Sequence, residues 1–264
     1  MMLRGFLVAL QFLTRISVRR DLRITDRDLA NSAAFFPIVG MFIGGAQALV
    51  FFLSGWVLSP SVTALFLLLV PVILTGAFHI EGLGDMADGF LGGKDKEDIL
   101  RIMKDSHVGT MGMTAVVCLI LAKYIFLCEI VQALSPSIVI GVLLLAPGLS
   151  RWGMVIAAGV SQYARLPPYR GGIGRAFAEG VGGKIVLLSG FVPVVATAIY
   201  LRMMGGFCIA ITILLALIAS WLAKRRINGV TGDVLGGINE ITEVVLLLSV
   251  IIMTRTSCLG FVIK

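Results

Sequence analysis

The sequence predicts an all-α, polytopic integral membrane helix bundle with about seven transmembrane helices and an N-terminal interfacial helix. The 264-residue chain is 58% hydrophobic and only 14% charged, and its mean hydropathy is +1.00. A soluble domain has about 45–50% apolar and about 25% charged residues, so two soluble domains are excluded. Seven apolar stretches approach the ~20 residues that a membrane-spanning helix needs.

The chain is expected to begin with the interfacial helix and to continue with the seven spans as one membrane domain over residues 1–264. Phe6–Val18 is apolar but too short to cross a bilayer, and its interruption by Arg15 predicts an amphipathic helix at the membrane surface. In the first span, Gly40 and Gly44 indicate a kinked or closely packed helix. The predicted spans are 30–58, 61–80, 111–134, 137–158, 184–201, 207–223 and 243–262.

The distribution of charge predicts how the bundle is oriented. Of the 22 Lys and Arg residues, 16 lie before the first span or within 81–110, 159–183 and 224–226, which share one side if the spans alternate. Basic residues gather on the cytoplasmic side, so we expect a cytoplasmic N-terminus and an external C-terminus. The net charge of +7 therefore indicates orientation in a lipid bilayer and no nucleic-acid partner.

The segment most informative about function is the acidic run that begins at His79. Glu81, Asp85 and Asp88 are spaced i, i+4, i+7, so they project from one side of a helix. Three such carboxylates repel each other unless a cation lies among them, and Mg²⁺ or Mn²⁺ takes oxygen ligands. We therefore predict a metal site, with a solvated acidic face as the alternative. Residues 79–112 are interpreted as a cytoplasmic acidic loop that carries the active site.

Two features of this segment stay open. Five glycines within 82–93 each lower helix propensity by ~1 kcal/mol relative to Ala. They indicate either close approach of the backbone to a group such as a pyrophosphate or ordinary packing between membrane helices. His79 falls on the opposite side of the predicted helix, where capping or packing is a commoner role than metal ligation.

Three later segments add candidate residues. Asp95–Lys104 has acids before bases and predicts a short surface helix. Lys104, Asp105 and His107 suit phosphate binding and proton transfer, or form a plain interfacial turn. Arg165 suits a phosphate, although binding to a lipid headgroup is the commoner role of such a residue.

The last polar segment has two interpretations. Asp233 and Glu240 would complete a metal site from a second part of the chain. A structural pairing with Arg or Lys is the alternative. Glu243 falls at the start of the predicted last span, where an unpaired carboxylate would be costly.

Four motifs together resemble the adenosylcobinamide-GDP ribazoletransferase family, also called the cobalamin-5′-phosphate synthases. They are HIEGLGDMADGFLGGKDKEDILRIMKDSHVGTMG at 79–112, FLTRISV at 12–18, FPIVG at 36–40, and VTGD at 230–233 with Glu240 and Glu243. The resemblance covers nearly the whole chain in order. Glu81 stands where the family usually has Asp, His107 where Arg is common, and Ser17 where Pro is common.

The resemblance implies a late, Mg²⁺-dependent step of vitamin B12 assembly in a prokaryotic cytoplasmic (inner) membrane. A hydroxyl of α-ribazole, or of its 5′-phosphate, would attack adenosylcobinamide-GDP and release GMP, giving adenosylcobalamin or its phosphate. A homo-oligomer is possible. The residues that would act are Glu81, Asp85 and Asp88 on Mg²⁺, assisted by Asp105 and Asp233; Lys104, Arg151 and Arg165 on phosphate; and Asp88, Asp105 or His107 as base.

Two other functions are weighed against this one. A CDP-alcohol-type phosphotransferase also clusters aspartates beside a membrane helix, but Asp88-Gly89 is followed here by Phe-Leu-Gly-Gly and lacks that family's DGxxAR opening. A transporter usually needs polar groups near the bilayer midplane, and only Lys123 and Arg151 are candidates for that.

Overall fold

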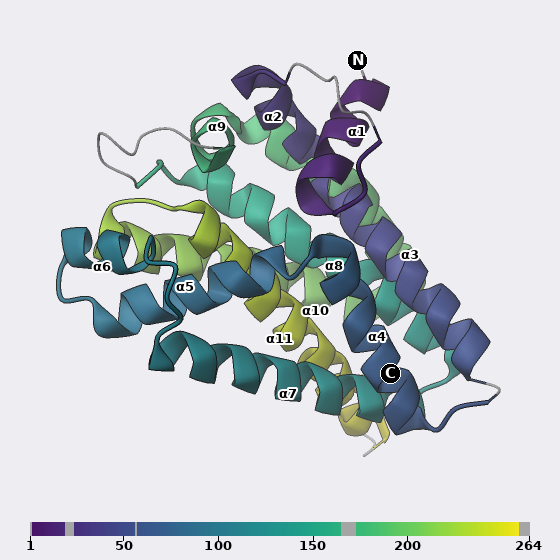
Figure 1. Cartoon of the computed structure of the whole chain (residues 1–264). Coiled ribbons are helices and arrows are strands. Elements are labelled where there is room, and N and C mark those ends of the chain that lie inside the picture. Colours follow the sequence, from purple (N-terminus) through teal and green to yellow (C-terminus); the bar gives the residue numbers. More distant parts are fainter. Residues whose placement is uncertain (1, 19–23, 56, 165–172, 259–264) are drawn as a thin grey trace.

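The fold is a bundle of α-helices, known from a computed structural model that describes residues 2–18, 24–55, 57–164 and 173–258. Within these ranges the only pairing of extended backbone is one parallel bridge between Tyr163 and Val230. The all-α class predicted from composition is confirmed (Figure 1). The helices are α1 (Met2–Leu13), α2 (Asp26–Ser32), the 3-10 helix η1 (Ala33–Phe35), α3 (Phe36–Ser54), α4 (Pro60–Thr75), α5 (Phe78–Gly92), α6 (Lys96–Ile102), α7 (Thr110–Ala133), α8 (Pro136–Val160), α9 (Ile173–Gly180), α10 (Gly183–Ile227) and α11 (Gly232–Cys258).

Helix α8 lies at the centre of the bundle. Of its most apolar stretch 83% is buried, against 22% for α7 and 28% for α10, whose apolar faces remain uncovered. Helix α3 packs closely on α8 because it presents glycines to it: a Cβ atom at Gly40 would collide with the carbonyl oxygen of Pro147, and one at Gly44 with that of Leu143. The close packing predicted from this small-xxx-small pattern is therefore confirmed.

Among the described residues, five helices are long and apolar enough to cross a membrane, or six if α4 and α5 are counted as one bent span. The 45-residue α10 is interrupted at Arg202, where φ is 49° and ψ is −121°. A Cβ atom at Gly205 would collide with the carbonyl oxygen of Thr197, so the chain folds back at this point. The break separates the predicted spans 184–201 and 207–223, although the count of seven spans stays a prediction.

The predicted span 61–80 is wrong at its end, because the chain bends there. Gly76 and Ala77 both adopt left-handed backbone conformations, with φ of 66° and 63°. Helix α5 consequently leaves α4 at an angle of 88°. Residues 79–112 are not a loop: they form α5, α6 and the first turn of α7, joined by two short connections. The short surface helix predicted within Asp95–Lys104 is confirmed as α6, with Asp95 as its N-cap.

Two other boundaries also differ from prediction. The N-terminal helix covers Met2–Leu13 and not 6–18, and it buries Leu10 and Leu13 against the bundle. Helix α11 begins at Gly232, eleven residues before the predicted span at 243. Its charged residues hid this start, because they interrupt the apolar pattern even though the helix continues through them.

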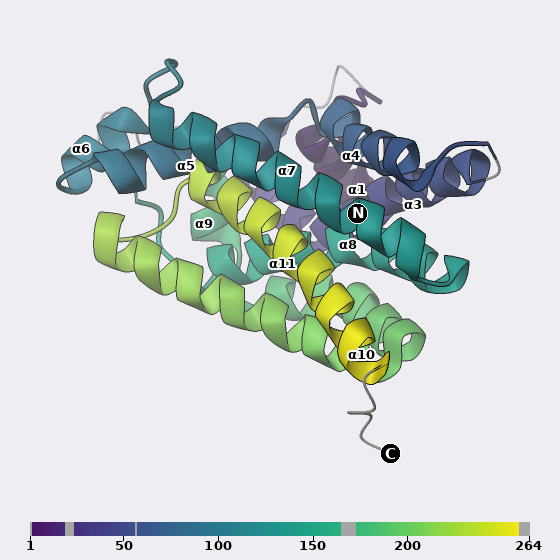
Figure 2. The ribbon, with the colours of Figure 1, turned by 90° about the horizontal axis from the view of Figure 1, so that it is seen from below.

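The two ends of the bundle are built differently. Helix α11 runs between α7 and α10 (Figure 2), and its C-terminal end reaches α7 through an ion pair of 2.6 Å between Arg255 and Glu129. At the same end Tyr200 Oη donates a hydrogen bond of 2.8 Å to the Ser137 carbonyl. The opposite end brings together α5, α6 and the N-terminal ends of α7 and α11. The carboxylates singled out from the sequence lie at this second end.

Candidate active site

The acidic helix α5 is positioned by α7 on one side and α11 on the other (Figure 1). The helix predicted from the i, i+4, i+7 spacing is present. Glu81 is exposed, and Asp85 and Asp88 are half-buried. His79, on the opposite side, has only 1% of its surface exposed. The fold therefore separates a buried side of α5 from a side that a substrate can reach.

Glycines allow α5 to approach its neighbours, which is the packing alternative left open above. A Cβ atom at Gly82 would lie 3.1 Å from both Cα and the carbonyl oxygen of Asp233. One at Gly93 would lie 2.5 Å from the side chain of Ile99 in α6. Because these glycines face protein backbone and side chains, they do not form a cradle for pyrophosphate.

The Gly82 contact also brings a second carboxylate-bearing segment to the acidic helix. Asp233 lies in the first turn of α11, and the hydroxyl of Thr231 donates a hydrogen bond of 3.2 Å to its Oδ2. Just before this turn, the amide of Ala164 donates to the Val230 carbonyl at 3.0 Å. Arg165, which follows Ala164 in the sequence, lies outside the described residues.

Asp88 joins α5 to the start of α7. Its Oδ2 accepts a hydrogen bond from the amide of Gly109 and its Oδ1 accepts one from the amide of Gly112, each 2.7 Å long. These amides belong to the N-terminal turn of α7, which has no intrahelical partner for them. Asp88 therefore caps α7, and it does so with a carboxylate at the positive end of the helix dipole.

The turn between α6 and α7 presents Lys104, Asp105 and His107 to solvent. His107 Nδ1 lies 2.6 Å from Asp105 Oδ1, and the amide of His107 donates to the same oxygen at 3.0 Å. These two hydrogen bonds, the backbone one foremost, lower the pKa of Asp105 below its usual value. The carboxylate is thus held ionised beside the anchored start of α7.

The predicted Mg²⁺ site fits the chemistry of these donors, although they do not form a complete cage. In the part of the chain that the structure describes, no group of three or more His, Cys, Asp or Glu side chains is arranged to hold a metal ion. Mg²⁺ is commonly bound by one or two carboxylates together with substrate phosphates and water. Glu81, Asp85 and Asp88 offer such carboxylates on one helix, and their role as ligands stays a prediction.

A cluster of charged side chains lies inside the bundle, beneath the acidic helix. Lys123 Nζ is 2.6 Å from Glu240 Oε2 and 3.3 Å from Glu243 Oε1. Asn239 donates to Glu240 Oε1 at 3.1 Å. Arg151, 2% exposed, donates to the Pro147 carbonyl at 3.0 Å. The two glutamates therefore form the structural pairing with a basic residue that was the alternative to a metal site. Arg151, which was predicted to bind phosphate, is instead buried among these groups.

The interior is more polar than the sequence suggested, since Glu240, Glu243 and His79 are buried near Lys123 and Arg151. Another contact was missed altogether: Arg226, at the end of α10, donates to the carbonyls of Phe90 and Gly93 at 2.5 and 3.4 Å. It thereby binds the C-terminal end of α5. In the sequence its basic triplet, 224–226, indicated only membrane orientation.

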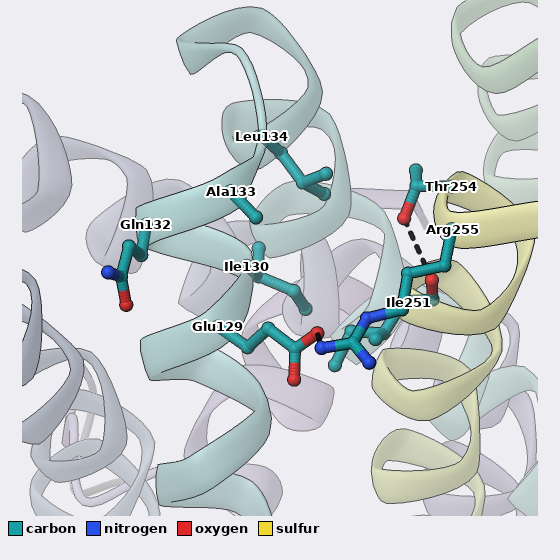
Figure 3. Close-up of a pocket in the computed structure, with 8 residues that line it drawn as sticks. All are labelled: Glu129, Ile130, Gln132, Ala133, Leu134, Ile251, Thr254 and Arg255. Carbon is teal, nitrogen blue, oxygen red and sulfur yellow. Dashed lines mark hydrogen bonds and ion pairs between the residues drawn. The ribbon is translucent and has the colours of Figure 1, made fainter. Parts of the chain in front are cut away.

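A hollow of about 310 Å³ is remote from the acidic helix. It lies between the C-terminal ends of α7 and α11, where the ion pair between Glu129 and Arg255 crosses it (Figure 3). None of the residues that line it belongs to α5 or to the turn between α6 and α7. The candidate site is therefore the open face of α5 and not this hollow.

Fold and site together define a polytopic helical membrane protein whose carboxylates gather on one helix at one end of the bundle. The chain belongs to the cobalamin-5-phosphate synthase family, whose model matches residues 5–251. This result confirms the family resemblance of the four motifs.

Individual relatives agree with the family match. The chain is 37% identical over 247 residues to the adenosylcobinamide-GDP ribazoletransferase of Clostridium kluyveri, covering 92% of this chain and 94% of the relative. It is 34% identical over 249 residues to that of Clostridium acetobutylicum, covering 94% and 95%. It is 36% identical over 268 residues to that of Chlorobium phaeobacteroides, covering 97% and 100%. No solved structure matches the chain.

Proposed function

We propose that the chain is an adenosylcobinamide-GDP ribazoletransferase, a membrane enzyme that completes the nucleotide loop of vitamin B12. It would join α-ribazole, or α-ribazole 5′-phosphate, to adenosylcobinamide-GDP and release GMP. The observation that carries the proposal is the full-length similarity to proteins of that name, which includes the acidic helix. The products would be adenosylcobalamin or its 5′-phosphate.

The exposed side of α5 would bind the pyrophosphate of adenosylcobinamide-GDP. When bound, Mg²⁺ would neutralise charge that develops on the transferring phosphorus and the leaving GMP. Glu81 and Asp85 are the carboxylates that we propose to hold it, together with Asp88, whose oxygens keep further lone pairs after capping α7. Lys104, on the exposed turn, would contact phosphate. Asp233, which lies beside Gly82 of α5, would assist.

Asp105 is our candidate for the group that accepts the proton of the attacking hydroxyl. The hydrogen bonds from His107 lower its pKa and keep it ionised at neutral pH. An ionised Asp fills this role in protein kinases, where phosphoryl transfer needs positioning more than a strong base. His107 would orient Asp105, a task that Arg, common at this position in the family, also performs by donating to a carboxylate.

The test is an assay of purified protein in bilayer vesicles, with release of GMP from adenosylcobinamide-GDP as the readout. We expect release only when α-ribazole and Mg²⁺ are both present, and loss of release on chelation with EDTA. Asp85→Asn should fold and insert but lose transfer, because it removes a carboxylate from the exposed side of α5. CMP release from a CDP-alcohol substrate would instead favour the other phosphotransferase class.

The control is Asp98→Asn. Asp98 is an acidic residue of α6 that binds Arg101 and the amide of Lys94 and does not belong to α5. It should retain transfer. Full activity of Asp85→Asn at limiting Mg²⁺ would contradict the metal assignment while leaving the reaction itself in place.

We further propose that the end of the bundle with α5 and α6 faces the cytoplasm in the prokaryotic inner membrane. The basic residues of 224–226 and Lys94, Lys96 and Lys104 lie at that end, as the concentration of positive charge on the cytoplasmic side requires.

A further inference from the structure

The buried cluster gathers charged groups from the four helices that meet at the candidate site. It comprises His79 of α5, Lys123 of α7, Arg151 of α8, and Glu240 and Glu243 of α11. Each residue has at most 6% of its surface exposed. Two cations thus face two carboxylates, so burial of these charges is compensated within the cluster.

The cluster lies deeper in the bundle than the carboxylates of the acidic side. Glu240 and Glu243 follow Asp233 by seven and ten residues, which corresponds to ~10 and ~15 Å along α11. Ionisable groups at such depth in a membrane protein are costly, and they mark functional positions more often than chance placements.

Two nitrogen atoms of the cluster are buried without a hydrogen-bond partner: His79 Nε2 and Arg151 Nε. Both residues line one small cavity, together with Lys123, Glu240 and Glu243. The space in this cavity that the centre of a water molecule can occupy is about 10 Å³. One water molecule needs roughly this volume and two to four polar partners, and this cavity offers both.

His79 belongs to the first turn of α5, which also contains the exposed Glu81. Its backbone is in close contact with α11, since a Cβ atom at Gly236 would lie 3.2 Å from the His79 carbonyl oxygen. The His79 side chain thus lines the cavity of the cluster, while its backbone lies against α11. The rotation of α5 about its axis decides whether Glu81 and Asp85 face outward.

We propose that His79 is a positioning residue of the transfer site, and that one water in this cavity joins its Nε2 to Arg151 Nε and to the charged groups beside them. The network fixes the rotation of α5 and so the direction in which its carboxylates point. A test that measures GMP release rests on the proposed function, whereas a test that measures hydrogen exchange in α5 does not.

The variants are His79→Leu, His79→Gln and Gln47→Leu. Leu removes the unpartnered nitrogen, whereas the amide of Gln places a nitrogen near the position of Nε2. Gln47 of α3 is the matched control: it is 3% exposed, its Nε2 donates to the Leu67 carbonyl at 2.9 Å, and its Oε1 is also unpartnered. It does not line the cavity. Where His79→Leu fails to accumulate, His79→Asn replaces it, because its shorter amide does not reach the cavity.

We expect His79→Leu to lower kcat for GMP release by about 10- to 100-fold, the usual effect of removing a residue that orients a site. KM for α-ribazole should change little. His79→Gln should restore kcat to within about threefold, and Gln47→Leu should leave kcat per folded enzyme unchanged. Equal losses in His79→Leu and Gln47→Leu, or no rescue by Gln, would overturn the proposal.

The readout independent of substrate is hydrogen exchange of the amides of residues 78–92 in detergent-solubilised protein. Exchange should become faster in His79→Leu but not in Gln47→Leu. Unchanged exchange in His79→Leu would overturn the positioning role even where GMP release is normal. Absence of GMP release by the wild-type protein would reject the proposed function alone, because the exchange measurement still tests His79. A density map with no water between His79 Nε2 and Arg151 Nε would overturn the bridge.

Discussion

Asp88 shows how one side chain serves both structure and chemistry. Its two oxygens accept the amides of Gly109 and Gly112, and the same carboxylate stands on the acidic side of α5. A glycine is needed at both partner positions, because a Cβ atom at either would collide with the carboxylate of Asp88. The turn between α6 and α7 is consequently fixed from a residue of α5.

We predict that Asp88→Ala lowers the free energy of unfolding by about 1–2 kcal/mol, the usual cost of removing a helix cap. It should also abolish transfer. Thermal unfolding in detergent and the GMP-release assay measure the two effects. Asp88→Asn keeps one accepting oxygen, so it should recover much of the stability but not the activity.

Gly112→Ala is the control for this prediction, since its Cβ atom would push against Asp88 and disturb the cap without removing the carboxylate group. A variant Asp88→Asn with wild-type activity would show that Asp88 acts only as a cap.

The pair formed by Asp105 and His107 carries a prediction about pH. Because hydrogen bonds from His107 lower the pKa of Asp105, its ionised form persists as the pH falls toward the ordinary Asp value. Transfer should therefore show no loss from protonation of Asp105 between neutral pH and about pH 5. In His107→Ala, which removes the imidazole donor, the acid limb of the pH–rate profile should move to higher pH.

The identity of residue 107 separates two roles. His107→Arg should retain transfer, because Arg also donates to Asp105, whereas Asp105→Asn should lose it. Loss of transfer in His107→Arg with retention in Asp105→Asn would identify His107 as the base and contradict our assignment.

At the scale of helices, α3 and α8 pack closely against each other. Gly40 and Gly44 lie directly against the carbonyl oxygens of Pro147 and Leu143, so the helices meet backbone to backbone. Such contacts replace the hydrophobic driving force that is missing between helices in lipid. The sequence revealed this feature, because glycines four residues apart in an apolar stretch have few other uses.

We predict that Gly44→Val destabilises the protein by about 1–3 kcal/mol, because the added side chain overpacks an interface that has no flexible neighbour to displace. The midpoint of thermal unfolding in detergent should fall accordingly. Gly45→Val is the matched control, since the nearest atom to a Cβ there is the end of the Leu144 side chain at 3.9 Å. Equal midpoints for the two variants would contradict this account of the contact.

Helix ends were harder to predict than helices. The bend between α4 and α5 depends on left-handed conformations at Gly76 and Ala77, and Ala carries no turn signal of its own. The start of α11 was missed because Glu240 and Glu243 interrupt its apolar pattern. Their partner Lys123 is 117 residues from Glu240 in the sequence, and no local pattern reveals a pairing over that distance.

At the scale of the whole molecule, composition was sufficient for the class of fold, and the i, i+4, i+7 spacing was sufficient for one acidic side of α5. The arrangement around it depends on tertiary contacts. Asp233 reaches α5 through Gly82, and Arg226 binds the carbonyl of Phe90, although neither relation has a sequence signature. The site therefore consists of one helix that the sequence predicts, α5, and of several other segments that only the fold brings to it.

The contact between Gly82 and Asp233 has a practical use in comparing relatives of this protein. At a separation of 3.1 Å, even a methyl group at residue 82 requires the backbone of Asp233 to shift by a few tenths of an ångström, and a larger side chain requires more. A relative with a larger residue there must have separated the two segments that we expect to share the substrate. Residue 82 is thus a marker, independent of the acidic residues, for whether a newly sequenced homologue has kept this geometry.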